Sequence, residues 1–312
     1  MMEQSEEIQD VRVVHFGLGS LGAAIARIVA SREGLTSVAA IDPTPGRDGR
    51  DVADLAGLGS ETGVVVEATA TRLRDVEADV VLYAPEGDLE AATTDLEILL
   101  EVGLNVVAIL PELAYPPDDD DDDLAVSIDT LAREAEVTAL ALDASDALLG
   151  TLPLSLTGVC QRVDKIVVRR HGATGSIGRL SLGDWAAALA TALGWALDDL
   201  DELEEARGGR PGGVHRIVGS VGGREVLVVE TVDDSTGGGS TLEVEVEGSP
   251  SLRMTLSGGA SAEEALATLA VNAIPAVLTS DPGLYTLPDL PPVHCWTSLG
   301  LMPADDELDD DV

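Results

Sequence analysis

The sequence contains very few aromatic residues and almost no lysine. Aromatic side chains make up 2% of the 312 residues, and Lys165 is the only lysine among 18 cationic residues. Since 45% of the residues are nevertheless hydrophobic, the cores must consist of Val, Leu, Ile and Ala. The length exceeds that of most single domains, and we expect two.

Positive charge is also scarce, and the formal net charge is −39. Such a chain repels nucleic acids and anionic membranes, so neither is expected as a partner. Two explanations of the acidity are open, namely adaptation to a salty cytoplasm or a cationic partner. The acid is spread along the whole chain and lysine is rare, which favours a salt-adapted, haloarchaeal source.

Cysteines and long apolar runs are scarce too. Two cysteines, Cys160 and Cys295, make neither a disulfide framework nor a metal site, and we expect no bound metal. No apolar run approaches the roughly 18–20 residues that span a bilayer, and the acidic N-terminal segment does not resemble a signal peptide. We therefore expect a cytoplasmic protein.

One segment carries a specific signal, the apolar run from Val11 that leads into glycines with GxGxxG spacing. The first glycine allows a tight turn, the second lets the backbone approach a pyrophosphate, and the third lets a helix pack closely. An acid at the end of the next apolar run, twenty residues later, is placed to bind ribose hydroxyls. The predicted dinucleotide-binding residues are Gly17, Gly19, Ser20, Leu21, Gly22 and Asp42.

Continuous apolar runs alternate with helical patterns over the first half of the chain. This alternation is typical of a doubly wound parallel sheet, and it predicts an α/β Rossmann domain over residues 1–148. Ligands of such sheets lie beyond the carboxyl ends of the strands, where Ala84 and Pro85 are further cofactor-binding candidates. The aspartate run at 118–123 is expected to be a solvated loop.

The second half alternates polar and apolar residues in several segments. This pattern predicts an α+β domain over 149–292 with an open, largely antiparallel sheet, followed by an acidic tail at 293–312. The last helix of this domain can pack back on the Rossmann domain. The open sheet is suited to cap an active site or to pair with a second subunit.

Polar residues near the strand ends are the candidates for chemistry. Glu112 follows the strand NVVAIL and can exchange a proton while a hydride moves, or it is an ordinary loop acid. Tyr115, His171 and Thr174 are candidates for the pocket wall, although His171 is equally compatible with a surface position. Lys165 lies in an alternating strand and can face inward or outward.

Four segments together resemble the 2,4-diaminopentanoate dehydrogenase and native amine dehydrogenase family, often grouped with dihydrodipicolinate reductase-like proteins. The resemblance implies a Rossmann domain, a dimerising α+β domain and reversible NAD(P)-linked deamination of an amine. It also implies that a glutamate in the pattern EELxYP is the key acid, which Glu112 of PELAYP matches at its second position. The segments are VRVVHFGLGSLGAAIARIV, NVVAILPELAYP, LLGTLPLSLTGVCQRV and VNAIPAVLTSDPGLYTLPDLP.

The sequence departs from this family at three places. Pro111 replaces the first glutamate of the pattern, and LALDASDAL stands where the family has an Asn-Pro-Gly turn. The segment after Gly178 is also shorter. These departures leave two alternatives open, another NAD(P)-linked reductase of a keto, imino or aldehyde substrate, or a non-catalytic nucleotide-binding paralogue.

The sequence thus predicts an NAD(P)-dependent amine dehydrogenase-like enzyme that forms a homodimer and acts on a small amine or carbonyl compound. Asp42 favours NAD because its charge repels a 2′-phosphate, whereas Arg47 and Arg50 could bind one, so NADP stays open.

Overall fold

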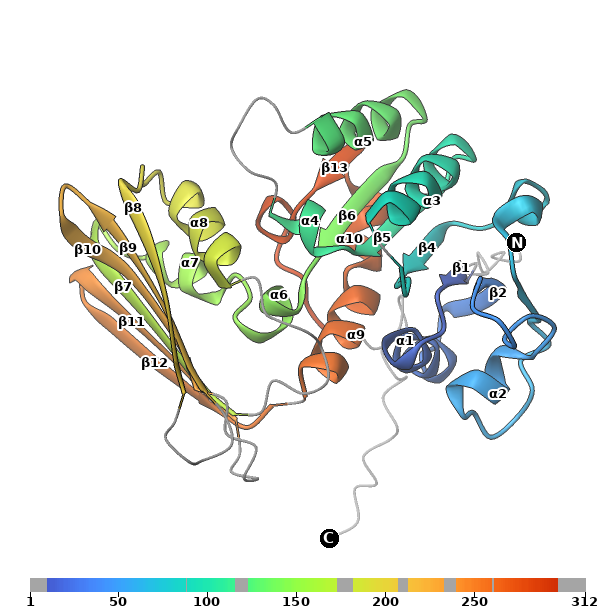
Figure 1. Ribbon diagram of the computed structural model, residues 1–312, viewed down its shortest axis with the longest axis horizontal. Helices are drawn as coiled ribbons and strands as arrows, with labels where there is room; N and C mark the ends of the chain where they lie inside the picture. Colours follow the sequence, from blue (N-terminus) through green and yellow to red (C-terminus); the bar gives the residue numbers. More distant parts are fainter. Residues whose placement is uncertain are drawn as a thin grey trace, which may run out of the picture.

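The fold was obtained as a computed structural model. The structure describes residues 10–87, 89–115, 123–172, 182–206, 213–232, 240–259 and 261–296. Two sheets stand side by side with helices between them (Figure 1).

The first sheet has seven parallel strands in the order β13-β6-β5-β4-β1-β2-β3. Its central strands consist largely of Val, Leu, Ile and Ala, as expected for strands that are buried on both faces. They are β1 (Val11–Phe16), β2 (Leu35–Ile41), β3 (Val66–Glu67), β4 (Val80–Tyr83), β5 (Asn105–Ile109), β6 (Thr138–Leu142) and β13 (Gly283–Tyr285).

Helices cover both faces of this sheet. One face carries α1 (Ser20–Ser31), α9 (Ala262–Asn272) and α10 (Ile274–Thr279), while α3 (Leu89–Glu101) and α5 (Asp123–Glu134) cover the other (Figure 1). This confirms the predicted doubly wound α/β fold. The short elements α2 (Val52–Ala56), η1 (Ala70–Asp75), α4 (Pro111–Ala114), α6 (Ala144–Leu148) and η2 (Leu287–Asp289) lie in the connections.

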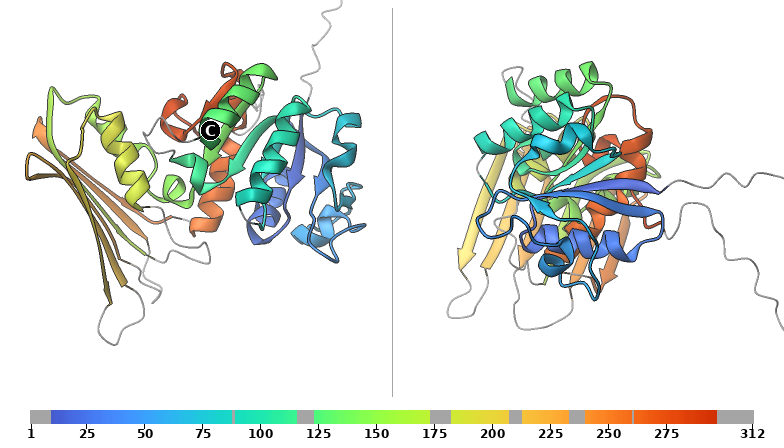
Figure 2. Two further views of the ribbon diagram at one scale, coloured as in Figure 1. Left: turned by 45° about the horizontal axis from the view of Figure 1, so that its top comes forward. Right: turned by 90° about the vertical axis from the view of Figure 1, so that its right-hand side faces the viewer.

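The second sheet has six strands in the order β12-β11-β7-β10-β9-β8, and only the β7–β10 pair is parallel. The prediction of an open, largely antiparallel sheet is therefore confirmed. Helices α7 (Leu152–Thr157) and α8 (Leu182–Ala192) cover the face that looks toward the first sheet, and no helix that the structure describes lies on the other face (Figure 2). The strands are β7 (Arg162–His171), β8 (Asp199–Ala206), β9 (Gly213–Val221), β10 (Arg224–Val232), β11 (Thr241–Ser249) and β12 (Leu252–Ser257).

After β12 the chain returns to the first sheet. Helix α9 packs against α1 and α6, α10 packs against β5 and β6, and β13 adds an edge strand beside β6. The stretch Ala262–Thr279 is 18 residues long and apolar enough to span a membrane by composition, although the sequence analysis expected no run of that length. The two helices of this stretch, α9 and α10, pack against the first sheet and its helices, so the stretch belongs to the core of this fold.

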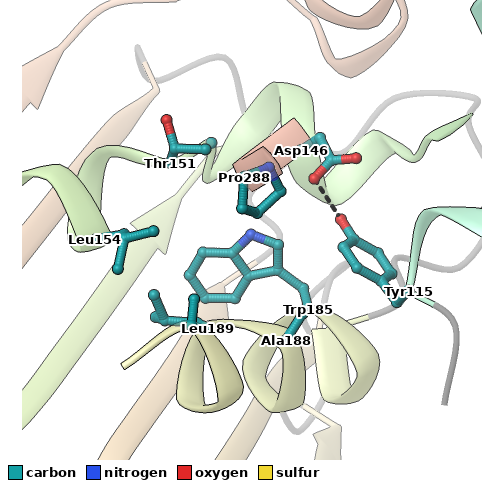
Figure 3. A pocket seen from close by; sticks show the side chains of 10 residues that line it. Tyr115, Asp146, Thr151, Leu154, Trp185, Ala188, Leu189 and Pro288 are labelled. Carbon is teal, nitrogen blue, oxygen red and sulfur yellow. Dashed lines mark hydrogen bonds between the residues drawn. The ribbon is translucent and has the colours of Figure 1, made fainter. Parts of the chain in front are cut away.

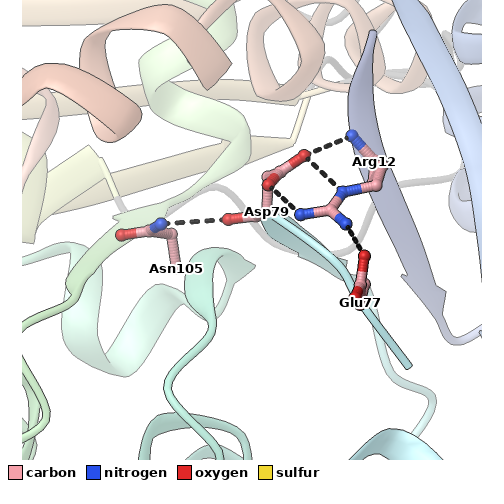
Figure 4. A network of polar contacts seen from close by, with 4 residues as sticks. All are labelled: Arg12, Glu77, Asp79 and Asn105. Atoms are coloured by element: carbon pink, nitrogen blue, oxygen red, sulfur yellow. Dashed lines mark hydrogen bonds and ion pairs between the residues drawn. The ribbon is translucent and has the colours of Figure 1, made fainter. Parts of the chain in front are cut away.

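A polar network holds the amino ends of the central strands together (Figure 4). Asp79 accepts hydrogen bonds from the backbone and the guanidinium of Arg12, which also pairs with Glu77. Asn105 donates to the carbonyl of Asp79 and accepts from the backbone of Thr138. Since these contacts lie at the amino edge of the sheet, they leave the opposite carboxyl edge for ligands.

Candidate active site

The glycine turn between β1 and α1 forms a cradle that side chains would fill. Gly17 has φ +84°, and a Cβ there would lie 2.1 Å from the carbonyl oxygen of Ala84. A Cβ on Gly22 would lie 2.0 Å from the carbonyl oxygen of Gly17. Gly19 is the N-cap of α1 and has no side chain to cap it, so the first-turn N–H groups, including those of Ser20 and Leu21, lack a side-chain partner. The turn therefore fits a pyrophosphate group.

Asp42 directly follows β2 and is 1% exposed. Its Oδ2 accepts hydrogen bonds from the Leu18 N–H at 2.6 Å and from Arg47 Nη1 at 2.6 Å, and its Oδ1 accepts from the Thr44 N–H at 2.8 Å. Burial works to raise the pKa of Asp42, but these hydrogen bonds outweigh it and hold the pKa below its usual value. Asp42 is thus a fixed carboxylate beside the glycine turn.

Arg47 links Asp42 to a second carboxylate that covers the turn. Its Nη2 lies 3.1 Å from Glu86 Oε2, and Glu86 Oε1 lies 2.2 Å from where a Cβ on Gly19 would be. The Glu86 carboxylate therefore rests where an incoming phosphate would approach the helix. On the other side, Ser20 Oγ donates to Glu263 of α9.

Glu112 belongs to the short helix α4, which starts just beyond the carboxyl end of β5. It is exposed and makes no hydrogen bond or ion pair with any residue that the structure describes. Pro111 occupies the first turn of this helix, where its missing N–H costs nothing.

Tyr115, which ends α4, meets an acid that the sequence analysis did not select. Its hydroxyl donates to Asp146 Oδ1 at 2.8 Å, and Tyr115 and Asp146 are 9% and 4% exposed. Asp146 Oδ2 accepts from the backbone N–H of Asp143, which completes a capping box at the start of α6. The segment DASDAL, which replaces the expected turn of the family, thus places a buried carboxylate next to Tyr115.

The electrostatics of this pair are unusual. Burial raises the pKa of Asp146 to about 7, opposed by its hydrogen bonds from Asp143 and Tyr115 and reinforced by the charge of Asp143. Burial and the neighbouring carboxylates raise the pKa of Tyr115 far above its usual value, so Tyr115 stays protonated. The pair therefore contains one group that titrates near neutral pH and one permanent hydrogen-bond donor.

Tyr115 and Asp146 lie at one end of a small cavity of about 20 Å³ between α6, α7, α8 and η2 (Figure 3), and Asp146 also lines an adjoining, more open pocket of about 400 Å³. The indole of Trp185 on α8 forms one wall. The other apolar walls come from Leu154, Leu189 and Pro288. Such a mixture of apolar walls and a few convergent polar atoms is typical of small-molecule sites.

The remaining candidates lie elsewhere. His171 is exposed at the end of β7, and alternation places it on the face opposite Arg170, which is 2% exposed. Lys165 lies on the outer face and pairs with Glu225 at 2.9 Å, which leaves it no part in a catalytic-lysine scheme. Thr174 lies outside the described residues, as does most of the aspartate run.

A histidine and two glutamates come together on β8 and β9. The ligand atoms of Glu202, Glu204 and His215 all lie within 4.8 Å of one another, and His215 Nε2 is 2.6 Å from Glu202 Oε1. These side chains could approach a divalent cation, although the two glutamates are exposed and none of the three lines the cavity beside Asp146.

Comparisons with known proteins agree with this architecture. Residues 207–301 match the model of the 2,4-diaminopentanoate dehydrogenase C-terminal domain. The chain is 24% identical over 337 residues to 2,4-diaminopentanoate dehydrogenase of Acetoanaerobium sticklandii, a match that covers 91% of this chain and 94% of the relative.

Solved structures share the fold over most of the chain. Amine dehydrogenase from Mycobacterium smegmatis superposes with a TM-score of 0.77 at 22% identity, covering 93% of this chain and 99% of its own. Dipicolinate-bound dihydrodipicolinate reductase from Paenisporosarcina sp. TG-14 gives a TM-score of 0.58 at 14% identity, with coverages of 89% and 98%. The chain is therefore distantly similar in sequence to 2,4-diaminopentanoate dehydrogenase over most of its length, and it shares the fold of an amine dehydrogenase and of dihydrodipicolinate reductase.

Proposed function

We propose that the protein is an NAD(P)-dependent oxidoreductase that interconverts a small amine with its carbonyl compound and ammonia. The observation that carries this proposal is the glycine cradle with the fixed carboxylate of Asp42 at the carboxyl edge of the first sheet. The cavity beside Tyr115 and Asp146 lies at the same edge, because Asp143 directly follows β6 and α4 begins at Pro111, just after the end of β5. The relationship to dehydrogenases of amines supports the reaction class.

Each part of the site has a role in this proposal. The first-turn N–H groups of α1 hold the pyrophosphate, and Asp42 accepts hydrogen bonds from a ribose. A bound nicotinamide would supply the hydride acceptor for the carbon that carries the nitrogen. Glu112, at the end of the neighbouring strand, exchanges the proton that the amine releases, and the apolar cavity walls exclude water from the reacting carbon.

Asp42 and Arg47 act in opposite directions on cofactor choice. The carboxylate disfavours a 2′-phosphate, whereas the guanidinium beside it is placed to pair with one. Because Arg47 is already engaged by Asp42 and Glu86, we propose that NAD is somewhat preferred and that NADP is also accepted.

The test is turnover of a substrate panel at high KCl. Purified protein is mixed with NAD⁺ or NADP⁺ and with short-chain primary amines, 2-hydroxy acids or secondary alcohols, and reduced nicotinamide is followed by its absorbance. We expect amines alone to be oxidised, and Glu112→Gln to lower kcat at least tenfold at unchanged affinity for NADH. Oxidation of hydroxy acids or alcohols in place of amines would point to another reductase, and tight NADH binding without turnover of any compound would point to a non-catalytic protein.

We also propose that two copies pair through the helix-free face of the second sheet. The charged side chains of this face, such as Arg253 and Glu245, which form a cross-strand ion pair, would then lie in the interface between the two copies. Light scattering at high KCl measures the mass directly, and a mass of one chain contradicts this part of the proposal.

A further inference from the structure

The inner end of the cavity between α6, α7, α8 and η2 presents hydrogen-bond acceptors. Asp146 Oδ1 accepts the only hydroxyl proton of Tyr115, and Asp146 Oδ2 accepts the backbone N–H of Asp143. The phenol oxygen of Tyr115 therefore has only lone pairs left to offer, and a carboxylate oxygen offers nothing else. A ligand that reaches this end must bring its own N–H or O–H donors.

The same end carries negative charge without a counter-ion. Asp143 and Asp146 are 3% and 4% exposed, and neither forms an ion pair with a residue that the structure describes. The carboxylate of Asp184 on α8 is a third acidic group whose charge acts on this end of the cavity. Buried charges are ordinarily paired, and an unpaired group shifts its pKa instead, as Asp146 does. A cationic group bound here would offset the unfavourable free energy of burying this negative charge.

The small cavity has room for a group about the size of a water molecule, and the indole face of Trp185 can lie against a cationic nitrogen there. The adjoining pocket is suited to hydrocarbon, because Leu154, Leu287 and Pro288 are among the residues that line it. None of the described residues that line this cavity is Arg, Lys or His, so a carboxylate or phosphate on the ligand would find no cation there.

We propose that Asp146 and Tyr115 form an ammonium-recognition site, which binds the protonated nitrogen of a small amine that carries an apolar substituent and no carboxylate. This rests on the proposed amine dehydrogenase function and names the substrate class of its pocket. The ammonium N–H groups donate to Asp146 Oδ1 and to Tyr115 Oη in the small cavity, and the substituent extends into the adjoining pocket along Leu154 and Pro288. Asp146 and Tyr115 are positioning residues in this scheme, whereas proton exchange stays with Glu112.

The site predicts a pH dependence of amine binding. The titratable groups that face Asp146 are Tyr115 from the end of α4, Asp143 from the start of α6, and Asp184 from α8. Tyr115 stays protonated, so the change near neutral pH comes from the Asp146 carboxyl. Amine affinity should rise as the pH increases from 6 to about 8, because Asp146 becomes charged while an alkylamine remains protonated.

The test measures binding rather than turnover. The full chain at high KCl is titrated by calorimetry with sec-butylammonium chloride, with 2-butanol as a neutral analogue and with butyrate as an anionic one. Asp146→Asn keeps the cap, since the Asn oxygen can accept from Asp143 while its amide donates to Tyr115. Asp95→Asn is the matched control, because Asp95 accepts from Tyr83 at 3.0 Å in a similar pair that does not line the cavity.

We expect Asp146→Asn to weaken sec-butylammonium at least tenfold and to abolish the rise between pH 6 and 8. Tyr115→Phe should weaken it severalfold, and Asp95→Asn should leave it unchanged. Equal affinity for 2-butanol and sec-butylammonium, or wild-type amine affinity in Asp146→Asn, overturns the inference. NADH binding and amine turnover by the wild-type protein are measured in separate experiments. If the wild-type protein fails to bind NADH or to oxidise amines, the proposed function is wrong, whereas the effect of Asp146→Asn on amine binding still tests the ammonium-recognition site.

Discussion

Replacing Asp42 by Asn tests the cofactor edge of the first sheet most directly. The side chain is 1% exposed and accepts from three donors, the Leu18 N–H, the Thr44 N–H and the Arg47 guanidinium. An asparagine of the same size keeps only one acceptor oxygen and turns an N–H₂ toward groups that are themselves donors. At least one buried donor therefore loses its partner.

The size of the effect follows from these contacts. A hydrogen bond to a charged group contributes about 1.5–3 kcal/mol, and removing one member of a buried ion pair costs about 3–5 kcal/mol. Arg47 retains Glu86 as a partner, so the lower part of this range applies. We expect Asp42→Asn to lower the free energy of unfolding by about 3 kcal/mol, which corresponds to about 6 °C in Tm.

Urea unfolding at high KCl, followed by circular dichroism, measures this difference, with Asp75→Asn as an exposed control. The pKa of Asp42 is lower in the folded state, so its contribution is present above the unfolded pKa of about 3.9. That contribution is lost as the pH falls through the folded value, so the two proteins should converge at acid pH. A loss below about 1 kcal/mol at pH 7, or one equal to that of Asp75→Asn, would refute the assignment of Asp42 as a buried three-fold acceptor.

Three further predictions concern neighbouring groups. A carboxyl with a raised pKa stabilises the fold only while it is protonated, so the stability of the wild-type protein should decline as the pH rises from about 4 to 7. In Asp146→Asn this decline should be smaller. Urea unfolding across this pH range measures the difference in unfolding free energy between the two proteins, which should not exceed about 4 kcal/mol. Glu86→Gln should tighten NADH binding by severalfold in fluorescence titration, since it frees Arg47 and removes a negative charge from the phosphate site, and weaker binding would show that Glu86 helps to hold the cofactor. Gly22→Ala should weaken NADH at least tenfold and lower Tm, because its Cβ has no room, whereas Gly59→Ala, where nothing lies within 4 Å, should do neither.

The first sheet follows closely from its sequence because each of its signals is local. Continuous apolar runs predict buried parallel strands, and the glycine spacing fixes the turn from β1 to α1. The second sheet is less accessible to such reasoning. Strand β8 has the sequence DLDELEEA. Its charges are compatible with an edge strand in solvent, but from the sequence alone they do not predict a strand. The insertion of β7 between β10 and β11 depends on packing over long sequence distances.

The candidate site likewise has one part that the sequence predicts and one part that only the fold brings together. Gly17, Gly22 and Asp42 are recognisable from their spacing, because the chemistry of a dinucleotide turn is contained in thirty residues. The contact between Tyr115 and Asp146 joins two different connections, 31 residues apart, and exists only because β5 and β6 end side by side. In the sequence, the only indication of this contact is the DASDAL segment, which places carboxylates where the resembling family has a tight turn.

The return of the chain to the first sheet after β12 has a consequence for how the protein folds during synthesis. Strand β13 and helices α9 and α10 cover an edge and a face of a sheet whose other strands were made more than a hundred residues earlier. Contacts of such high sequence separation form slowly, and exposed apolar strands are prone to aggregate meanwhile. The core around the first sheet can therefore be completed only once residue 285 has left the ribosome, and a fragment that ends before α9 should be insoluble when it is produced alone.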